Sequence, residues 1–232
     1  MSDLIDTTEM YLKTIFELEE EGIPPLRARI AERLGHSGPT VSQTIARMER
    51  DGLVSLAGDR HLEFTASGRE RATRVMRKHR LAERLLVDVI GLEWEYVHDE
   101  ACRWEHVMSE RVERRIVELL RGDHTSPFGN PIPGLDELGA TSVREGFRDG
   151  LQTLTSVAGP NPTRVTVRRI GEPVQVDHEA LNLLTDSGVI PGEAAEVHAA
   201  DGRVIAVGAG RPPADGVSLP PEISDHVFVA LT

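Results

Sequence analysis

LRARIAERLGHSGPTVSQTIARMERDGLVSLAGDRHLEF fills residues 26–64 and predicts two helices followed by a β-hairpin. Apolar residues recur at helical spacing over 26–34 and 39–51, and they alternate over 53–64. The GHSG tetrapeptide between the helices is a tight turn, and Pro39 suits the first turn of the second helix. A helix, a short turn, a helix and a hairpin in this order are typical of a winged helix-turn-helix.

The second of these helices has a polar face that is suited to a DNA major groove. Gln43 can pair with adenine, and the small residues Ser37, Pro39 and Thr40 can approach thymine methyl groups. Four arginines are expected to bind phosphates, which fix the register without specifying sequence: Arg27, Arg47, Arg50 and Arg60. The alternative is a small helical subdomain with a solvated basic face, but DNA binding is the favoured interpretation.

The rest of the chain predicts more helices and then a β domain. Apolar spacing, caps and glycines predict helices at 6–21, 65–90, 94–108 and 109–120. Three prolines and two glycines prevent regular structure over 126–134, and 135–162 is loop-rich. Short alternating runs after Thr163 suggest a small β barrel; they lie at 165–167, 195–198, 204–207 and 227–229.

The composition is that of a soluble globular protein, with 232 residues, 39% hydrophobic residues and 28% charged residues. The net charge of -12 opposes nucleic-acid binding at first sight, but residues 27–80 carry twelve basic and six acidic groups, a local charge of +6. The single cysteine, Cys102, excludes an intrachain disulfide. Neither a signal peptide nor a membrane span is apparent, so we expect a cytoplasmic protein.

Potential metal ligands recur at helical offsets on two successive predicted helices. Cys102, Glu105 and His106 form C-x-x-E-H, and offsets of three and four place them on one helix face. His79 and Glu83 repeat the offset of four, and His98 lies just upstream of Cys102. Singly, each is more often a hydrogen-bonded histidine, a buried thiol or a solvated acid. Together they favour metal, and their mixed donors suit iron(II), cobalt(II), nickel(II) or zinc(II) better than magnesium or calcium.

Several longer motifs stand out along the chain. They are DTTEMYL at 6–12, LRARIAERL at 26–34, SGPTVSQT at 37–44, MRKHRLAERLL at 76–86 and EACRWEHVM at 100–108. Together they resemble the diphtheria toxin repressor family, the iron-dependent regulators of actinobacteria. The resemblance is dense over residues 1–140 and weaker beyond.

This resemblance implies two metal sites per subunit. The primary, activating site would use Met10, Cys102, Glu105 and His106, with the Cys102 carbonyl and a water completing six-coordination. The ancillary site would use five residues, two of them from an E-x-x-Q motif in the third domain: His79, Glu83, His98, Glu172 and Gln175. Pro173 inside that motif departs from the family's usual residues. Thioether and thiol ligands indicate the iron branch, with cobalt(II), nickel(II), manganese(II) and zinc(II) as substitutes.

The resemblance also implies an α+β multidomain fold and a partner. We expect a winged helix at 1–73, a helical dimerisation and metal-binding domain at 74–140, a linker at 141–162 and an SH3-like β barrel at 163–232. The expected function is an iron(II)-activated homodimeric repressor on palindromic operator DNA, with one or two dimers per operator. The full set of expected DNA contacts is Thr7, Arg27, Ala28, Ser37, Pro39, Thr40, Ser42, Gln43, Arg47, Arg50 and Arg60.

Three alternatives stay open. The protein could be a DNA-binding regulator with a purely structural metal, or a regulator that prefers manganese. A non-haem iron enzyme is compatible with the donor set, but no paired catalytic motif accompanies it, so we expect no enzyme.

Overall fold

The computed structural model describes residues 6–120, 122, 124–141 and 146–232. The chain forms two compact units. The first unit comprises residues 1–85, 100–124 and 132–144, and the second comprises 86–99, 125–131 and 145–232.

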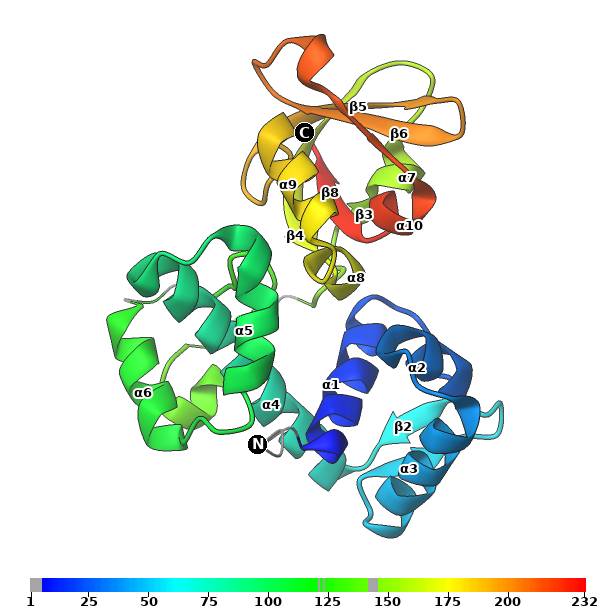
Figure 1. The fold of residues 1–232 in the computed structure, drawn as a ribbon, viewed down its shortest axis with the longest axis vertical. Coiled ribbons are helices and arrows are strands. Elements are labelled where there is room, and N and C mark those ends of the chain that lie inside the picture. Colours follow the sequence, from blue (N-terminus) through cyan, green and yellow to red (C-terminus); the bar gives the residue numbers. More distant parts are fainter. Residues whose placement is uncertain (1–5, 121, 123, 142–145) are drawn as a thin grey trace. The chain divides into compact units, whose positions relative to one another are not determined.

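The N-terminal part of the first unit is the predicted winged helix (Figure 1). The hairpin strands pair antiparallel, with Ser55 opposite Glu63. Its elements are α1 (Thr7–Glu20), α2 (Arg27–Leu34), α3 (Gly38–Arg50), β1 (Val54–Leu56) and β2 (Leu62–Phe64).

Caps explain where these helices begin and end. The Asp6 carboxylate accepts hydrogen bonds from the Thr8 and Glu9 backbone N–H groups at the start of α1. Ser37 caps α3 in the same way through the Thr40 N–H. Gly35 ends α2 with φ +63°, a left-handed conformation that glycine adopts without a Cβ penalty.

The apolar faces of the three helices and of the hairpin form one core. Tyr11, Leu12 and Ile15 are fully buried at its centre, and Met10 packs against its edge. The other buried members are Phe16, Leu18, Ile30, Val41, Ile45, Met48, Leu53, Val54, Leu62, Ala72 and Met76. This core holds α3 by one face and leaves its opposite face to solvent.

The helical part of the first unit contains α4 (Ala66–Leu85), α6 (Glu110–Leu119), the short helix η3 (Leu135–Leu138) and the end of α5 (Val97–Trp104). Thr65 caps α4, since its hydroxyl accepts a hydrogen bond from the Gly68 N–H. A buried ion network joins α4 to α6, because the Arg77 guanidinium donates to Glu113 at 2.6 Å and to the Gly134 carbonyl at 2.8 Å.

Two predicted helix ends need correction. The helix expected to reach residue 90 is α-helical only to Leu85, and Leu86–Ile90 forms a π-helical turn, η1, before Gly91 at φ +76°. The helix expected at 94–108 begins as a 3-10 turn, η2 (Trp94–Tyr96), and α5 ends at Trp104. It ends early because the chain tightens, with the Val107 N–H bonded to the Trp104 carbonyl, before α6 begins.

The second unit contains a six-stranded antiparallel sheet, which confirms the predicted C-terminal β domain. The strand order is β3-β8-β4-β5-β6-β7, and a bulge interrupts the β4–β8 register between Val167 and Arg169. The strands are β3 (Gln152–Thr153), β4 (Thr163–Ile170), β5 (Ala194–Ala200), β6 (Arg203–Gly208), β7 (Val217–Leu219) and β8 (Val227–Leu231). The expected linker at 141–162 therefore includes the first strand, while its residues 142–145 lie outside the described ones.

Helices missing from the sequence prediction complete this unit. The longest, α9 (His178–Ser187), buries Leu181 and Leu184 and is capped by the Asp177 side chain. The shorter ones are α7 (Leu154–Val157), α8 (Glu172–Gln175), η4 (Pro213–Asp215) and α10 (Pro221–Ser224).

The proline-rich segment at 125–131 belongs to the same unit. Phe128 is fully buried and its ring lies 4.9 Å from that of Trp94. The Phe128 carbonyl accepts a hydrogen bond from the Ile170 N–H, and the Asn130 amide donates to the Ile170 carbonyl. The segment is irregular, as predicted, but these bonds attach it to β4.

Among the described residues, no helix combines the length and the apolar content that crossing a membrane requires.

Candidate metal centre and nucleic-acid interface

The outer face of α3 presents the residues expected to read bases. Gln43 and Thr40 are exposed on this helix, and Ser42 is half-exposed beside them. Ser37 and Pro39 are exposed at its start, while Val41, Ile45 and Met48 on the opposite face are buried. The helix is therefore held by its apolar side and offers donors and acceptors on the other, as major-groove reading requires.

The basic residues around α3 differ in their exposure to solvent and in their ion pairing within the protein. Arg47 and Arg50 are exposed in the last two turns of α3, and Arg60 is exposed in the hairpin loop with φ +71°. Arg27 is half-buried at the start of α2 and lies 3.6 Å from Glu49, so its charge is partly neutralised within the protein. Thr7 and Ala28 are exposed at the starts of α1 and α2.

The four residues expected at the primary metal site all belong to the first unit. Met10 lies half-buried on α1, and Cys102 lies half-buried on α5. Glu105 and His106 follow in the turn after α5, where Glu105 is only 2% exposed. Glu105 keeps a helical hydrogen bond to the Ala101 carbonyl, so the C-x-x-E-H spacing still stacks Cys102 and Glu105 on successive turns.

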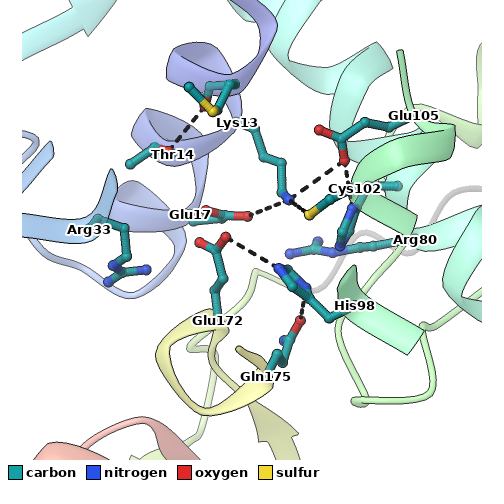
Figure 2. Close-up of polar contacts among 12 residues, drawn as sticks. Lys13, Thr14, Glu17, Arg33, Arg80, His98, Cys102, Glu105, Glu172 and Gln175 are labelled. Carbon is teal, nitrogen blue, oxygen red and sulfur yellow. Dashed lines mark hydrogen bonds and ion pairs between the residues drawn. The ribbon is translucent and has the colours of Figure 1, made fainter. Parts of the chain in front are cut away.

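Three of the expected ligands, Cys102, Glu105 and His106, have polar partners within the protein. The Lys13 ammonium on α1 donates to the Cys102 sulfur at 3.1 Å and lies 3.5 Å from the Glu105 carboxylate (Figure 2). Glu105 also contacts His79 at 2.6 Å, and His106 Nδ1 lies 2.8 Å from Glu9.

These contacts shift the protonation of the ligands. Burial disfavours the charged form of Glu105, but the Lys13 ammonium and the His79 ring hold its pKa below the usual value. Burial also disfavours charge on His106, but Glu9 and Glu105 raise its pKa. Because a metal binds only the neutral imidazole, a raised pKa makes His106 harder to deprotonate and so opposes its use as a ligand in the metal-free arrangement.

The residues present fit a first-row transition ion. A thioether, a thiol, an imidazole and a carboxylate form a borderline donor set, and softer sulfur ligands disfavour magnesium and calcium. The position of the Lys13 ammonium against sulfur and carboxylate oxygen also shows that these atoms accommodate a positive charge. The donor types of these four residues therefore suit such an ion, and their assignment to one site stays a prediction.

The residues expected at the ancillary site fall in both units. In the first unit, His79 is 2% exposed on α4, and its Nε2 lies 2.8 Å from Glu83. Burial and the Lys13 charge oppose protonation of this ring, but Glu83 and Glu105 raise the pKa of His79 well above 6.5.

In the second unit, His98, Glu172 and Gln175 come together (Figure 2). His98 Nδ1 lies 3.1 Å from the Gln175 amide oxygen, and its Nε2 lies 3.6 Å from the Glu172 carboxylate. The Gln175 amide nitrogen donates to the Ile170 carbonyl, which turns the oxygen toward His98. Pro173 stands in the first turn of α8, where proline is tolerated, so the unusual E-P-V-Q sequence still aligns both side chains.

Sequence reasoning missed Lys13, Glu9 and Arg80. Arg80 is buried and binds Glu20 of α1 at 2.9 Å. Lys13 directly follows the apolar residues Tyr11 and Leu12, and this position was the one sequence signal for it. The structure shows that α1 is buried on every side over this stretch. Apart from Glu17, which lies one turn after Lys13, the partners named here for these three residues are distant in sequence, so no local pattern predicts them.

Comparison with known proteins identifies the family. Residues 3–62 match a family model described as iron dependent repressor, N-terminal DNA binding domain. Residues 65–134 match the model described as iron dependent repressor, metal binding and dimerisation domain. The chain is 57% identical over 230 residues to the iron-dependent repressor IdeR of Mycobacterium leprae (strain TN), covering 99% of each chain. It belongs to the iron-dependent repressor family.

Other members of the iron-dependent repressor family and a manganese regulator are similar too. The diphtheria toxin repressor of Corynebacterium glutamicum is 59% identical over 205 residues, covering 88% of this chain and 89% of that protein. A solved manganese-dependent transcriptional repressor in complex with manganese has 28% identity and a TM-score of 0.80, covering 97% of this chain and 100% of that one. The family expected from the motifs is thus confirmed, and the α3 face and the C-x-x-E-H segment fall inside the two matched domains.

Proposed function

We propose that this iron-dependent repressor family member is an iron(II)-activated, homodimeric transcriptional repressor that acts on palindromic operator DNA in the cytoplasm. The observation that carries the proposal is that one compact unit holds both an exposed reading face on α3 and a buried thiol, carboxylate and imidazole set. Family membership supports the same assignment.

The proposed primary ligands are Met10, Cys102, Glu105 and His106. Iron(II), when bound, supplies a positive charge shared between α1 and the segment after α5. Met10 is on the helix that forms the core of the winged helix, so its engagement restricts the orientations of α1 and of the reading helix that packs with it. Metal and DNA then favour each other's binding reciprocally.

The proposed dimer uses an exposed apolar surface on the helical part of the first unit. Val107, Val112 and Leu119 are 59%, 46% and 58% exposed, and the last two are seven residues apart on one face of α6. Exposed aliphatic groups gathered in this way favour association. A two-fold dimer would place two α3 helices on two half-sites, so we expect a palindromic operator read by one or two dimers.

The proposed ion is iron(II), with cobalt(II), nickel(II), manganese(II) and zinc(II) as substitutes, and with two sites per subunit. Sulfur ligands support iron over manganese. The ancillary ligands stay a prediction, supported in one unit by the His79–Glu83 pair and in the other by the His98, Glu172 and Gln175 cluster.

An electrophoretic shift assay with operator DNA tests the proposal. Purified protein should shift DNA with iron(II) under anaerobic conditions, lose the shift on chelation and regain it on adding metal. His106→Ala should require far more metal, whereas His124→Ala, outside the ligand set, should behave like the parent protein.

Other outcomes would support the alternatives. A regulator with a structural metal would unfold on chelation, which circular dichroism would detect in the same samples. A manganese regulator would respond to manganese(II) at lower free concentration than to iron(II). An enzyme would not shift DNA at all, and a shift that persists in chelator with folded protein would contradict the repressor proposal.

A further inference from the structure

Lys13 is a buried cation among the primary metal ligands. Its residue is 4% exposed, although lysine is almost never buried without compensation. Its ammonium donates to the Cys102 sulfur at 3.1 Å and lies 3.5 Å from Glu105 and 3.9 Å from Glu17 (Figure 2). Removing an ammonium from water is unfavourable unless such partners replace the water.

The atoms that hold Lys13 include two of the proposed metal ligands. Cys102 Sγ and a Glu105 carboxylate oxygen would each have to contact an ion at about 2.0–2.3 Å, judging from zinc–ligand distances. In this structure the Lys13 ammonium lies 3.1 Å from the sulfur and 3.5 Å from the carboxylate oxygen. Two cations cannot share these atoms closely, because like charges at this separation repel strongly in a buried environment.

We propose that Lys13 is the resident cation of the metal-free primary site. Its ammonium neutralises Glu105 and donates a hydrogen bond to Cys102 when no metal is present, and it must leave both before they bind an ion. Lys13 thereby sets the metal concentration at which the protein responds. This inference rests on the proposed function, since it concerns the same site.

The fold offers the displaced ammonium another acceptor. Glu17 lies one helical turn after Lys13 on α1, and its carboxylate is already 3.9 Å away. Only molecules in which the ammonium has moved away are competent to bind metal, so the apparent dissociation constant exceeds the intrinsic one by the inverse of their fraction.

Cobalt(II) titration of the DNA-free protein tests this inference, with the absorption of bound cobalt as the readout. Lys13→Leu removes the charge, keeps an apolar side chain in the buried space and adds no metal ligand. We expect its dissociation constant for cobalt(II) to fall about tenfold or more, equivalent to ~1.4 kcal/mol. Lys13→Arg, which keeps the charge, should stay closer to the parent protein than to Lys13→Leu.

The chain provides a matched control, because Lys78 is its only other lysine. Lys78→Leu removes the same charge from α4 and should leave cobalt affinity unchanged. Without metal, Lys13→Leu should melt at a lower temperature than the parent, because Glu105 loses its counter-charge and Cys102 loses its hydrogen-bond donor. Saturating cobalt should close that gap, a result that a merely structural role of Lys13 would not produce.

A second variant keeps the inference testable in case Lys13→Leu does not fold. Lys13→Gln keeps a hydrogen-bond donor beside Cys102 and Glu105 but removes the charge, and it should also bind cobalt(II) more tightly than the parent. Folded Lys13→Gln or Lys13→Leu protein with the cobalt affinity of the parent would overturn the inference.

The outcomes separate this inference from the proposed function. If His106→Ala and Cys102→Ser weaken cobalt binding but Lys13→Leu is folded and binds like the parent, the inference is wrong and the proposed site stands. If neither His106→Ala nor Cys102→Ser affects cobalt binding, the primary site itself is wrong and the inference falls with it.

Discussion

Different side chains on α3 are expected to contact bases and phosphates. Gln43 is exposed at the centre of the reading face, whereas Arg50 is exposed at the end of the helix, where it suits a phosphate. Gln43→Ala should therefore relax preference at one base pair, by about 1–3 kcal/mol if the amide pairs bidentately with adenine. Arg50→Ala should weaken all sequences alike and flatten the salt dependence.

Competition binding against operators changed one base pair at a time measures both effects. Base preference that is unaltered by Gln43→Ala would remove this residue from the reading set. A sequence-dependent effect of Arg50→Ala would contradict its assignment to a phosphate.

His79 makes the stability of the metal-free protein depend on pH. Glu83 and Glu105 raise the pKa of His79 well above 6.5 against the effects of burial and Lys13. A raised folded-state pKa means that its stabilising contribution is complete below about pH 6.5 and is lost as the pH rises through the folded-state value. Urea unfolding in chelator should show His79→Gln less stable than the parent at low pH, with the difference shrinking as the pH rises. A difference that grows with pH would contradict this.

Residue patterns predicted part of the candidate site. The C-x-x-E-H spacing made Cys102, Glu105 and His106 candidate ligands because helical offsets are local, and their role stays a prediction. Met10 came only from family resemblance, since an apolar stripe does not distinguish a ligand from a core residue. Lys13 was not predicted because the Cys102 thiol and the Glu105 carboxylate lie about 90 positions later in the sequence, and only the fold brings them to α1.

At the scale of elements, the start of α4 is fixed against the hairpin by a glycine. A Cβ on Gly68 would lie 1.8 Å from the Leu53 carbonyl oxygen, which belongs to the backbone and cannot rotate away. Gly68→Ala should destabilise the protein by about 3 kcal/mol or more, despite the higher helix propensity of alanine. Urea unfolding measures this effect. Gly58→Ala in the hairpin loop, where nothing lies within 4 Å, is the control and should change stability little.

Elements with strong local signals were predicted well, and those set by distant contacts were not. Apolar spacing, Ser37 and Gly35 placed α2 and α3 within a residue or two. The helix α9 was missed although Leu181 and Leu184 have helical spacing, because the region reads as alternating runs broken by glycine. The early end of α5 depends on a tight turn that no single residue type predicts.

At the scale of the whole molecule, the proposed dimer depends on the apolar surface of Val107, Val112 and Leu119. Leu119→Asp places a charge on this surface and should convert the dimer to a monomer in analytical ultracentrifugation. Leu231→Asp, at an equally exposed leucine in β8, is the control and should leave the dimer intact. A Leu119→Asp protein that sediments as a dimer would move the interface elsewhere.

The attachment of residues 125–131 to β4 limits how the molecule can be dissected. Phe128 and Asn130 precede the expected linker in sequence, yet both bond to Ile170 beyond it. A chain shortened to end at residue 140 would keep residues 125–131 but lose β4. The Phe128 ring, which is fully buried in the intact protein, would then become exposed to solvent. Such a fragment should bind a hydrophobic dye and precipitate more readily than the full chain. Replacing Phe128 with a polar residue should restore the solubility of this fragment. Studies of DNA binding by the fragment would therefore need that substitution.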